Sequence, residues 1–198
     1  MHRRVFLIRH CQSEANADLR VETRGDSALT ALGVEQARQR AHTLAAHELA
    51  EVTVVASPLK RAARTAREIA DHHGWTVAHD DRLTEGDLGR LEGLAYHELV
   101  NHLPAGARWL DAETHGGESE AVVGERMLEA LAAALEAAPG PVVIVSHGYA
   151  ISALLKRLGR ETRQLANGDM FELHLDESTA VRLLEHHPLD AQAPAAQH

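Results

Sequence analysis

Short apolar runs alternate along this chain with longer stretches in which apolar residues recur every three or four positions. The short runs are rich in Val, Ile and Ala and predict strands, whereas the periodic stretches predict amphipathic helices. The predicted strands are residues 5–8, 52–56, 76–79 and 142–145, with a closing hairpin at 170–176 and 180–184. The predicted helices are residues 30–47, 57–73, 96–102, 119–138 and 149–158. Strands that alternate with helices in this way predict an α/β sheet with helices on both faces.

Capping residues support three of the helix starts. Thr30 and Ser119 precede periodic stretches, and both types of side chain accept hydrogen bonds from the free N–H groups of a first helical turn. Ser57 is followed by Pro58, so we expect Ser57 to be the N-cap and Pro58 the first residue of the helix that ends near residue 73.

Composition bounds the organisation of the chain. Its 198 residues suit one domain, predicted over 1–187, and the Ala, Gln and Pro of residues 188–198 predict a disordered tail. The net charge of -9 argues against a general nucleic-acid or membrane surface. A single cysteine, together with an N-terminal apolar run that Arg9 interrupts after four residues, predicts a cytoplasmic protein without a signal peptide or membrane span.

Reactive and cationic residues follow three of the predicted strands. Arg9 and His10 end the first, Ser57 leads from the second toward Arg61, and His147 ends the run at 142–145. Ligands of α/β sheets bind beyond the carboxyl ends of the strands, so we expect these residues to converge. An imidazole can act as a nucleophile or base near neutral pH, and a guanidinium binds phosphate or carboxylate oxygens.

These residues belong to separated motifs that resemble those of the histidine phosphatase superfamily, in the same order. That family contains cofactor-dependent phosphoglycerate mutases and many phosphomonoesterases, and the resemblance spans about residues 4–160. The matching stretches are 9–16 (RHCQSEAN), 29–33 (LTALG), 57–66 (SPLKRAARTA), 83–85 (LTE) with Gly89 and 92–93 (EG), and 145–148 (VSHG). The resemblance implies a three-layer α/β/α sandwich with a mostly parallel central sheet, like that of phosphoglycerate mutase.

The resemblance also implies roles for individual residues. His10 would attack phosphorus and form a phosphohistidine, and Arg9, Arg61 and His147 would hold the non-bridging oxygens. Nearby arginines would favour the neutral, nucleophilic form of His10.

Three further residues complete the implied site. Asn16 would add a neutral donor, Gly148 would bind substrate beside His147, and Glu85 would act as general acid and base. No cofactor and no metal are expected, because the arginines supply the positive charge.

Cys11 departs from the family pattern, which has Gly after the nucleophilic His. The departure questions the backbone freedom of this turn and invites a rival mechanism, that of phosphatases with a Cys-x5-Arg loop. Here Ala17 stands where that arginine belongs, so we expect Cys11 to have no catalytic role. Its sensitivity to oxidation depends on whether it lines the pocket.

The fifteen histidines raise the question of a metal site. They include adjacent pairs, His72 with His73 and His186 with His187, but not the spacings typical of zinc sites. Scattered, solvated histidines are therefore the prediction.

The choice between phosphatase and mutase depends on charge near the Glu85 loop. A mutase must hold a second acidic group on its substrate, yet residues 86–118 offer only Arg90 and Arg108. Residues 116–119 (GGES) resemble the phosphatase branch, so the prediction is a phosphomonoesterase acting on a small phosphorylated metabolite. A cofactor-dependent phosphoglycerate mutase is the alternative, and a non-catalytic phosphate-binding module is a third possibility. The sequence does not indicate an oligomeric state.

Overall fold

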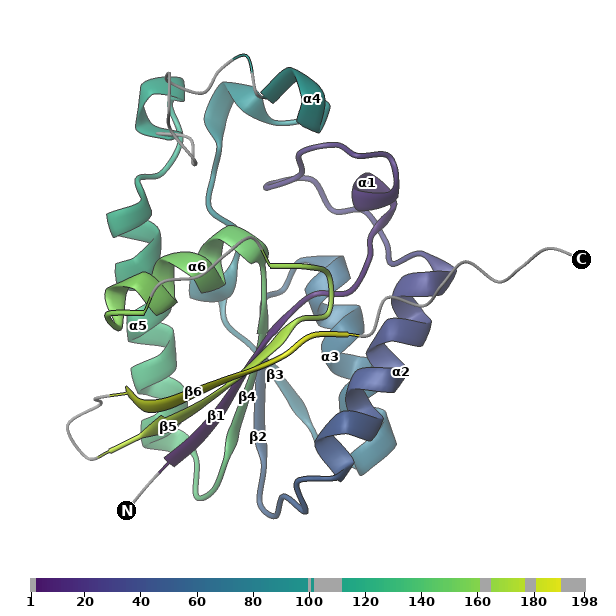
Figure 1. Cartoon of the computed structure of the whole chain (residues 1–198), viewed down its shortest axis with the longest axis vertical. Coiled ribbons are helices and arrows are strands. Elements are labelled where there is room, and N and C mark those ends of the chain that lie inside the picture. The colour runs from purple at the N-terminus through teal and green to yellow at the C-terminus, as the bar shows by residue number, and fades with distance from the viewer. Residues whose placement is uncertain (1–2, 100, 102–111, 161–164, 177–180, 190–198) are drawn as a thin grey trace, which may run out of the picture.

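The computed structural model describes residues 3–99, 101, 112–160, 165–176 and 181–189. It contains a six-stranded sheet in the order β3-β2-β4-β1-β5-β6 (Figure 1). The first four strands are parallel, β5 pairs antiparallel with β1, and β6 pairs antiparallel with β5. The strands are β1 (Arg3–Arg9), β2 (Thr53–Ala56), β3 (Val77–His79), β4 (Val142–Ser146), β5 (Met170–Leu175) and β6 (Val181–His187). Every strand expected from an apolar run is present, and β6 extends beyond the predicted end at 184.

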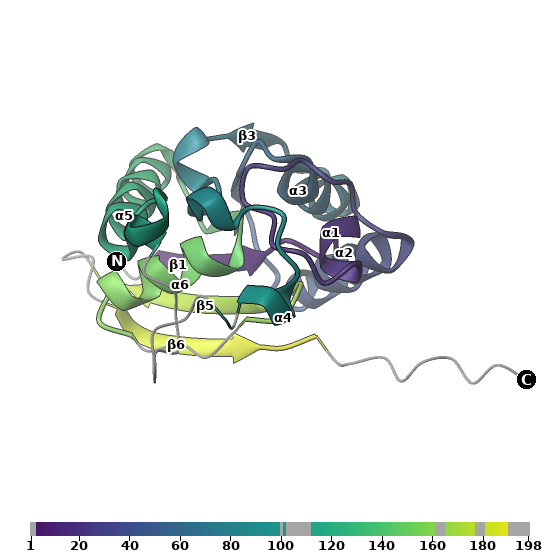
Figure 2. The same ribbon diagram turned by 90° about the horizontal axis from the view of Figure 1, so that it is seen from above.

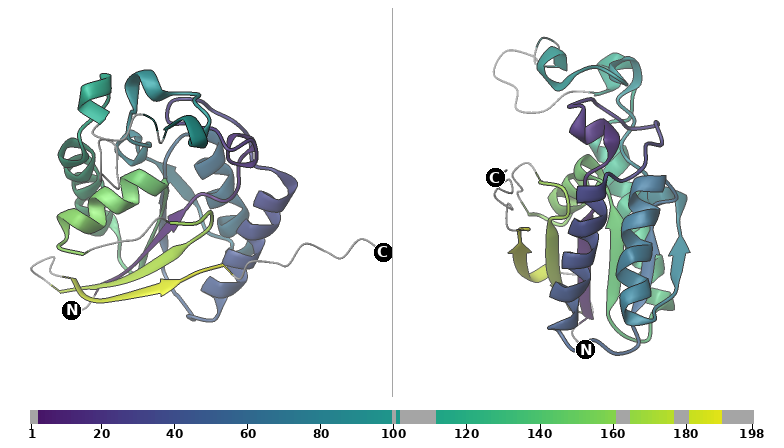
Figure 3. Two further views of the ribbon diagram at one scale, coloured as in Figure 1. Left: turned by 45° about the horizontal axis from the view of Figure 1, so that its top comes forward. Right: turned by 90° about the vertical axis from the view of Figure 1, so that its right-hand side faces the viewer.

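Helices cover both faces of this sheet. Helices α2 (Ala31–Ala45) and α3 (Lys60–His73) lie on one face, and α5 (Glu120–Ala137) and α6 (Gly148–Arg157) lie on the other (Figures 2 and 3). The predicted three-layer α/β/α sandwich with a mostly parallel sheet is therefore confirmed. Among the described residues, no helix combines the length and the apolar character needed to cross a membrane.

The strands alternate between two hydrophobic cores. In β1, Val5 and Leu7 pack toward α5 and α6, whereas Phe6 and Ile8 pack toward α2 and α3. This division follows from the pleat of a strand, which sends successive side chains to opposite faces. Strand β4 is buried on both faces, which explains its uninterrupted β-branched run.

Two of the three predicted caps are confirmed, and the third is wrong. The Thr30 hydroxyl accepts the Gly33 N–H (3.0 Å) and that of Ser119 accepts the Val122 N–H (3.3 Å). Helix α3, however, begins at Lys60 with Leu59 as its N-cap. Ser57 lies two residues before this cap, and its hydroxyl accepts the Leu59 N–H (3.3 Å) and also contacts His147 Nε2 (2.8 Å).

Loops and short helices cover the carboxyl ends of the strands. They include α1 (Glu14–Ala17), which the sequence did not predict, and α4 (Tyr96–Leu99), the beginning of the predicted helix at 96–102. The loop after α1 pairs with the segment before α4: Val21 donates to the Leu94 carbonyl and Tyr96 to the Leu19 carbonyl, both at 2.8 Å. Residues 100 and 102 of the predicted helix, and residues 190–198 of the predicted disordered tail, lie outside the described residues.

Candidate active site

Three adjacent strand ends bring the predicted site residues together. The His10 N–H donates to the Ser146 carbonyl (2.8 Å), which joins the ends of β1 and β4. The Ser57 N–H donates to the Val145 carbonyl (3.0 Å), which joins the end of β2 to β4. The sheet therefore positions His10, Ser57 and His147 side by side, before any side-chain interaction is considered.

The His10 imidazole is buried and held in one orientation. Its Nδ1 lies 2.8 Å from the Cys11 carbonyl oxygen, which can only accept, so Nδ1 carries a proton and donates. Burial, followed by the charges of Arg9 and Arg61, lowers the pKa of His10 well below its ordinary value. The ring is therefore neutral at pH 7, with the lone pair on Nε2. A neutral imidazole with a free Nε2 is a competent nucleophile.

The His147 side chain lies beside His10, with ring centroids 5.1 Å apart. The Ser57 hydroxyl oxygen accepts the Leu59 N–H (3.3 Å), so its own hydrogen is available for His147 Nε2 at 2.8 Å. Burial and the neighbouring His10 lower the pKa of His147 well below its ordinary value. We assign the Ser57 hydroxyl as the donor to Nε2, which places the proton of this neutral ring on Nδ1. That Nδ1 is buried and has no hydrogen-bond partner within the described part of the chain.

Arg9 provides a second buried donor of the same kind. One terminal nitrogen of its guanidinium donates to the Leu165 carbonyl, while its buried Nε finds no partner among the described residues. The guanidinium packs against Gly148, where an added Cβ would lie 3.3 Å from Arg9 Nε. Gly148 therefore allows the Arg9 side chain to lie close to the start of α6. Buried donors are normally satisfied, so the two that lack a partner in the described structure, His147 Nδ1 and Arg9 Nε, indicate a site for an anion.

Arg61 is buried, but most of its donors are committed elsewhere. One terminal nitrogen donates to the Glu22 carboxylate (3.1 Å) and the Gly25 carbonyl (2.7 Å), and the other to the carbonyls of Glu22 (3.2 Å) and Thr23 (3.4 Å). A guanidinium has five N–H groups, so Nε is the donor outside these bonds. Arg61 thus holds the loop at 22–25 while its charge acts on His10 and His147.

Asn16 lies against the backbone of His10 through a second amide. Its Oδ1 accepts from Ser13 (3.2 Å from the N–H and 3.1 Å from the hydroxyl) and from Asn167 Nδ2 (2.8 Å). Asn167 Nδ2 also donates to the His10 carbonyl (3.2 Å). These contacts commit Oδ1 of Asn16 and leave its amide nitrogen as the atom able to donate to a ligand.

The Glu85 carboxylate contacts the first turn of α6, the helix that begins directly after His147. Its Oε1 accepts the N–H groups of Gly86 and Ala150, both at 2.9 Å, and its Oε2 accepts the Tyr149 N–H at 3.3 Å. Oε2 has the single, longer bond and is the oxygen better able to exchange a proton. Arg126 on α5 fixes this loop, because its guanidinium donates to the carbonyls of Arg82, Thr84 and Glu85 (2.7–3.0 Å).

The other acids near Glu85 in sequence are engaged with loop groups. Asp87 pairs with Arg24 and accepts the Gly89 N–H. Glu92 accepts the N–H and hydroxyl of Thr23, and Glu118 pairs with Arg126. Among these acids, Glu85 is the one whose carboxylate contacts the start of α6.

Cys11 is fully buried, and burial raises the pKa of its thiol to about 12. A thiol with so high a pKa remains protonated, which argues against both the thiolate mechanism and sensitivity to oxidation. Its backbone is not left-handed: the non-glycine residues with positive φ in the described structure are Leu19, Glu48 and Glu51. The turn therefore accepts a side chain where the family has Gly.

Several supporting residues were not found from the sequence. They are Ser57 in its contact with His147, Glu22 under Arg61, Asn167 beside Asn16, and Arg126 behind the Glu85 loop. Ser57 was predicted only as a helix cap, and Glu22 and Asn167 lie in polar loops without a motif. Arg126 carried a weak signal, as an arginine in a helix otherwise dominated by Ala, Leu and Glu.

The fold and this group of strand-end side chains define an α/β protein with a candidate anion site beside two buried histidines. The chain belongs to the histidine phosphatase superfamily, whose branch 1 family model matches residues 5–192. This membership confirms the resemblance seen in the sequence and the prediction of an enzyme of the phosphatase class.

The similar proteins include one named as a probable mutase and one named as a phosphatase. The chain is 35% identical over 160 residues to the probable phosphoglycerate mutase GpmB of Salmonella paratyphi C, covering 78% of this chain and 74% of that protein. The solved structure of the mycobacterial glucosyl-3-phosphoglycerate phosphatase Rv2419c is similar with a TM-score of 0.78 and 28% identity, covering 96% and 100% of the two chains. The structure of Rv3214 from Mycobacterium tuberculosis is similar with a TM-score of 0.75 and 29% identity, covering 92% and 95%.

Proposed function

We propose that this protein is a phosphomonoesterase that hydrolyses a small phosphorylated metabolite through a phosphohistidine on His10. The observation that carries the proposal is a pair of buried nitrogens near His10 that have no partner among the described residues, Arg9 Nε and His147 Nδ1, the second being a donor in the tautomer that we assign. A phosphoryl group has three non-bridging oxygens, and its transfer is accelerated mainly by positioning and by donors fixed around those oxygens. Because the arginines supply positive charge, the proposed reaction uses no metal ion.

The proposed reaction has two half-reactions. First, His10 Nε2 forms a bond to phosphorus while the ester P–O bond breaks, and Glu85 protonates the departing oxygen. The proton stays on His10 Nδ1 and is donated to the Cys11 carbonyl oxygen, and this hydrogen bond stabilises the positive charge that develops on the ring. Second, Glu85 takes a proton from water, the water oxygen attacks phosphorus, and the N–P bond breaks to release phosphate and restore His10.

Charge near His10 supports each half-reaction. Arg9 and His147 would hold the phosphoryl oxygens through their unpaired donors, and Asn16 would contribute its amide nitrogen. We assign Arg61 a role through its charge and through the loop at 22–25, with Nε as its donor toward phosphate. Gly148 would contribute by letting the Arg9 side chain lie close to His147.

We place the leaving group of the ester in a cavity beside Arg9 and Asn16, two of the proposed phosphoryl-binding residues. It has a volume of about 450 Å³ and mixes apolar side chains with two amides. Its lining residues are Arg9, Asn16, Leu19, Tyr96, Leu165, Ala166 and Asn167. Among these described residues Arg9 alone is positively charged, so the cavity suits an uncharged, partly apolar alcohol better than the carboxylate of a phosphoglycerate. The cavity therefore favours hydrolysis over phosphoglycerate mutase activity. Mutase activity is the second candidate, and the observation that supports it is the likeness to GpmB.

The test is hydrolysis of p-nitrophenyl phosphate in EDTA by the wild type, His10→Ala and Glu85→Gln. We expect turnover by the wild type and its loss in His10→Ala. For Glu85→Gln we expect a loss that is largest for alkyl phosphates, whose leaving oxygens need a proton. Glu14→Gln, an exposed acid in the same motif, is the matched control and should stay near wild type.

Three results would overturn this proposal. Isomerisation of 3-phosphoglycerate in the presence of 2,3-bisphosphoglycerate, faster than any hydrolysis, would make the protein a mutase. Binding of one phosphate per chain without turnover of any ester in a substrate screen would make it a binding module. Hydrolysis that survives in His10→Ala would exclude the phosphohistidine.

A further inference from the structure

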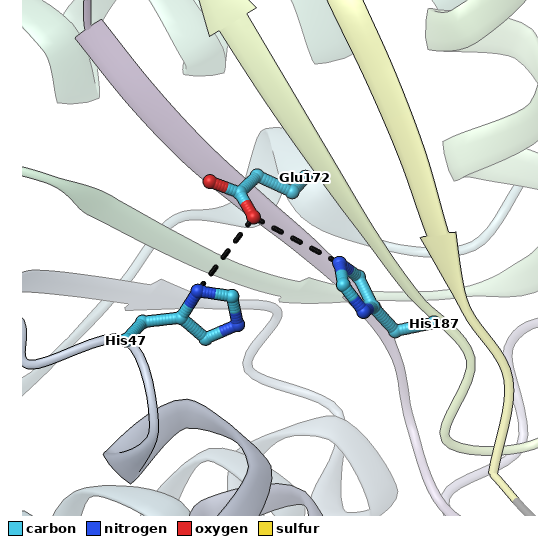
Figure 4. Close-up of side chains that lie close together, drawn as sticks. All are labelled: His47, Glu172 and His187. Atoms are coloured by element: carbon cyan, nitrogen blue, oxygen red, sulfur yellow. Dashed lines mark ion pairs between the residues drawn. The ribbon is translucent and has the colours of Figure 1, made fainter.

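Three side chains of the types that bind metal ions, from segments far apart in the sequence, meet on the face of the sheet that α2 covers. Glu172 is a buried residue of β5, His187 ends β6, and His47 follows the last turn of α2. One ligand atom of each side chain lies within 4.8 Å of the other two, and Glu172 Oε2 faces His47 Nδ1 and His187 Nε2 (Figure 4). Glu172 pairs in register with Phe6, four residues before His10, which puts the group on the order of 13 Å from the nucleophile along β1.

The carboxylate oxygen lies within ion-pair distance of both imidazoles but makes no hydrogen bond to either (Figure 4). Glu172 Oε2 is 3.7 Å from His47 Nδ1 and 3.8 Å from His187 Nε2, which is beyond hydrogen-bond length. His187 Nε2 is buried and has no hydrogen-bond partner in the described structure. A triangle with these sides places a common point about 2.4 Å or less from each atom, close to the length of a zinc–ligand bond.

The contacts around the group orient it for a ligand. The other carboxylate oxygen, Oε1, accepts from Arg4 Nε (2.6 Å) and bonds His174 Nε2 (2.9 Å), which turns Oε2 toward the two histidines. Arg40 donates to the His187 carbonyl (3.0 Å) and fixes the end of β6. Metal ligands are commonly oriented by such outer hydrogen bonds.

We propose that His47, Glu172 and His187 bind a divalent transition-metal ion, with Zn²⁺ the best match to two imidazoles and a carboxylate. The ion ties the end of α2 to β5 and β6 and stabilises the fold. The ion takes no part in the reaction at His10. The proposal of this site does not rest on the proposed phosphatase function. Sequence spacing cannot reveal this site, because its ligands are far apart in the chain.

Arg4 opposes metal binding at this site. One of its terminal nitrogens lies 2.8 Å from His47 Nδ1, the atom that would bind the ion, so this contact must break. The Arg4 side chain is 31% exposed, so its terminal nitrogen can move away from His47 while Nε keeps its contact with Glu172 Oε1. Binding should therefore be weaker than at a site with only ligands around it.

The experiment is a zinc titration of the EDTA-treated, dialysed full chain by calorimetry, together with its thermal unfolding. We expect one Zn²⁺ per chain at this site, a higher Tm with zinc, and an affinity at least tenfold lower in His187→Gln and Glu172→Gln. Exposed His79 provides the matched control, since His79→Gln should bind like the wild type. Zinc-edge anomalous diffraction should place the ion between the three side chains.

Three outcomes would overturn the proposal. They are no zinc binding, binding that His187→Gln leaves within twofold of wild type, or an anomalous peak elsewhere, such as beside His42 and His72. Because Glu172 is buried, its variant can fail to fold, and the partly exposed His187 then carries the test. Activity in EDTA separates this proposal from the phosphatase, since a metal-free wild type should still hydrolyse phosphate esters.

Discussion

Ser57→Ala tests how the structure fixes the tautomer of His147. In the wild type the Ser57 hydroxyl accepts from Leu59 and donates to His147 Nε2 at 2.8 Å. That donation leaves the proton on Nδ1, where it can meet a phosphoryl oxygen. Alanine removes the donor without introducing a charge or a larger side chain, so the ring stays buried but loses the contact that selects its tautomer.

The magnitude follows from the burial of both groups. Leaving one partner of a buried hydrogen bond unsatisfied costs about 1–3 kcal/mol. If this loss falls on the transition state, kcat/KM decreases by roughly 5- to 160-fold, at about 1.4 kcal/mol per factor of ten. The larger effect should be on kcat, because charge on the phosphoryl oxygens is greatest during transfer.

The assay compares kcat and KM for p-nitrophenyl phosphate in Ser57→Ala and in Ser152→Ala. Ser152 on α6 loses a hydroxyl of the same chemistry, one that donates to a helix carbonyl, and should stay within twofold of wild type. Nitrogen-15 NMR should find His147 protonated at Nδ1 in the wild type and a mixture of tautomers in Ser57→Ala. Wild-type kcat in Ser57→Ala, or an Nε2-protonated ring in the wild type, would refute the reasoning.

Three further predictions concern packing and protonation. Gly33→Ala should lower unfolding free energy by about 1–3 kcal/mol in urea titrations, because a Cβ would lie 2.1 Å from the Gln12 carbonyl oxygen; an unchanged midpoint would contradict this. Native Cys11 should resist thiol reagents, and Cys11→Ala should keep phosphatase activity; rapid labelling or lost activity in the folded variant would oppose its assignment as a buried, inert thiol. His10 and His147 have lowered pKa values in the folded protein, so below about pH 6.5 the unfolded chain binds protons that the folded chain does not. As the pH is lowered below about 6.5, the free energy of unfolding should therefore decrease by up to about 1.4 kcal/mol per pH unit for each ring. His10→Asn should reduce this slope, and an equal slope would argue against a buried neutral imidazole.

The parts of the fold visible in the sequence are those with local causes. The apolar run at β4 and the caps Thr30 and Ser119 depend on neighbouring residues, and each lies where it was expected. Arg9, His10 and His147 could be grouped in advance because parallel strands carry their ends to one edge of a sheet.

The parts that the sequence did not reveal depend on long-range contacts. Ser57 resembled a helix cap by every local rule, and its contact with His147, which is 90 residues away in the chain, could not be read from neighbouring residues. The commitment of Arg61 to the loop at 22–25 requires knowing where that loop lies. The group of His47, Glu172 and His187 likewise exists only because α2, β5 and β6 pack together.

The central claim, a phosphohistidine on His10, is tested most directly by rapid-quench labelling with a phosphorus-32 aryl phosphate in EDTA. We predict a label that approaches one per chain, is labile in acid and stable in base, maps to His10 and is absent from His10→Ala. Glu85→Gln should retain the labelling with an aryl phosphate, whose leaving group needs little protonation, and lose the label slowly. A wild type that turns over without such a label, or one whose label persists in His10→Ala, would contradict the account.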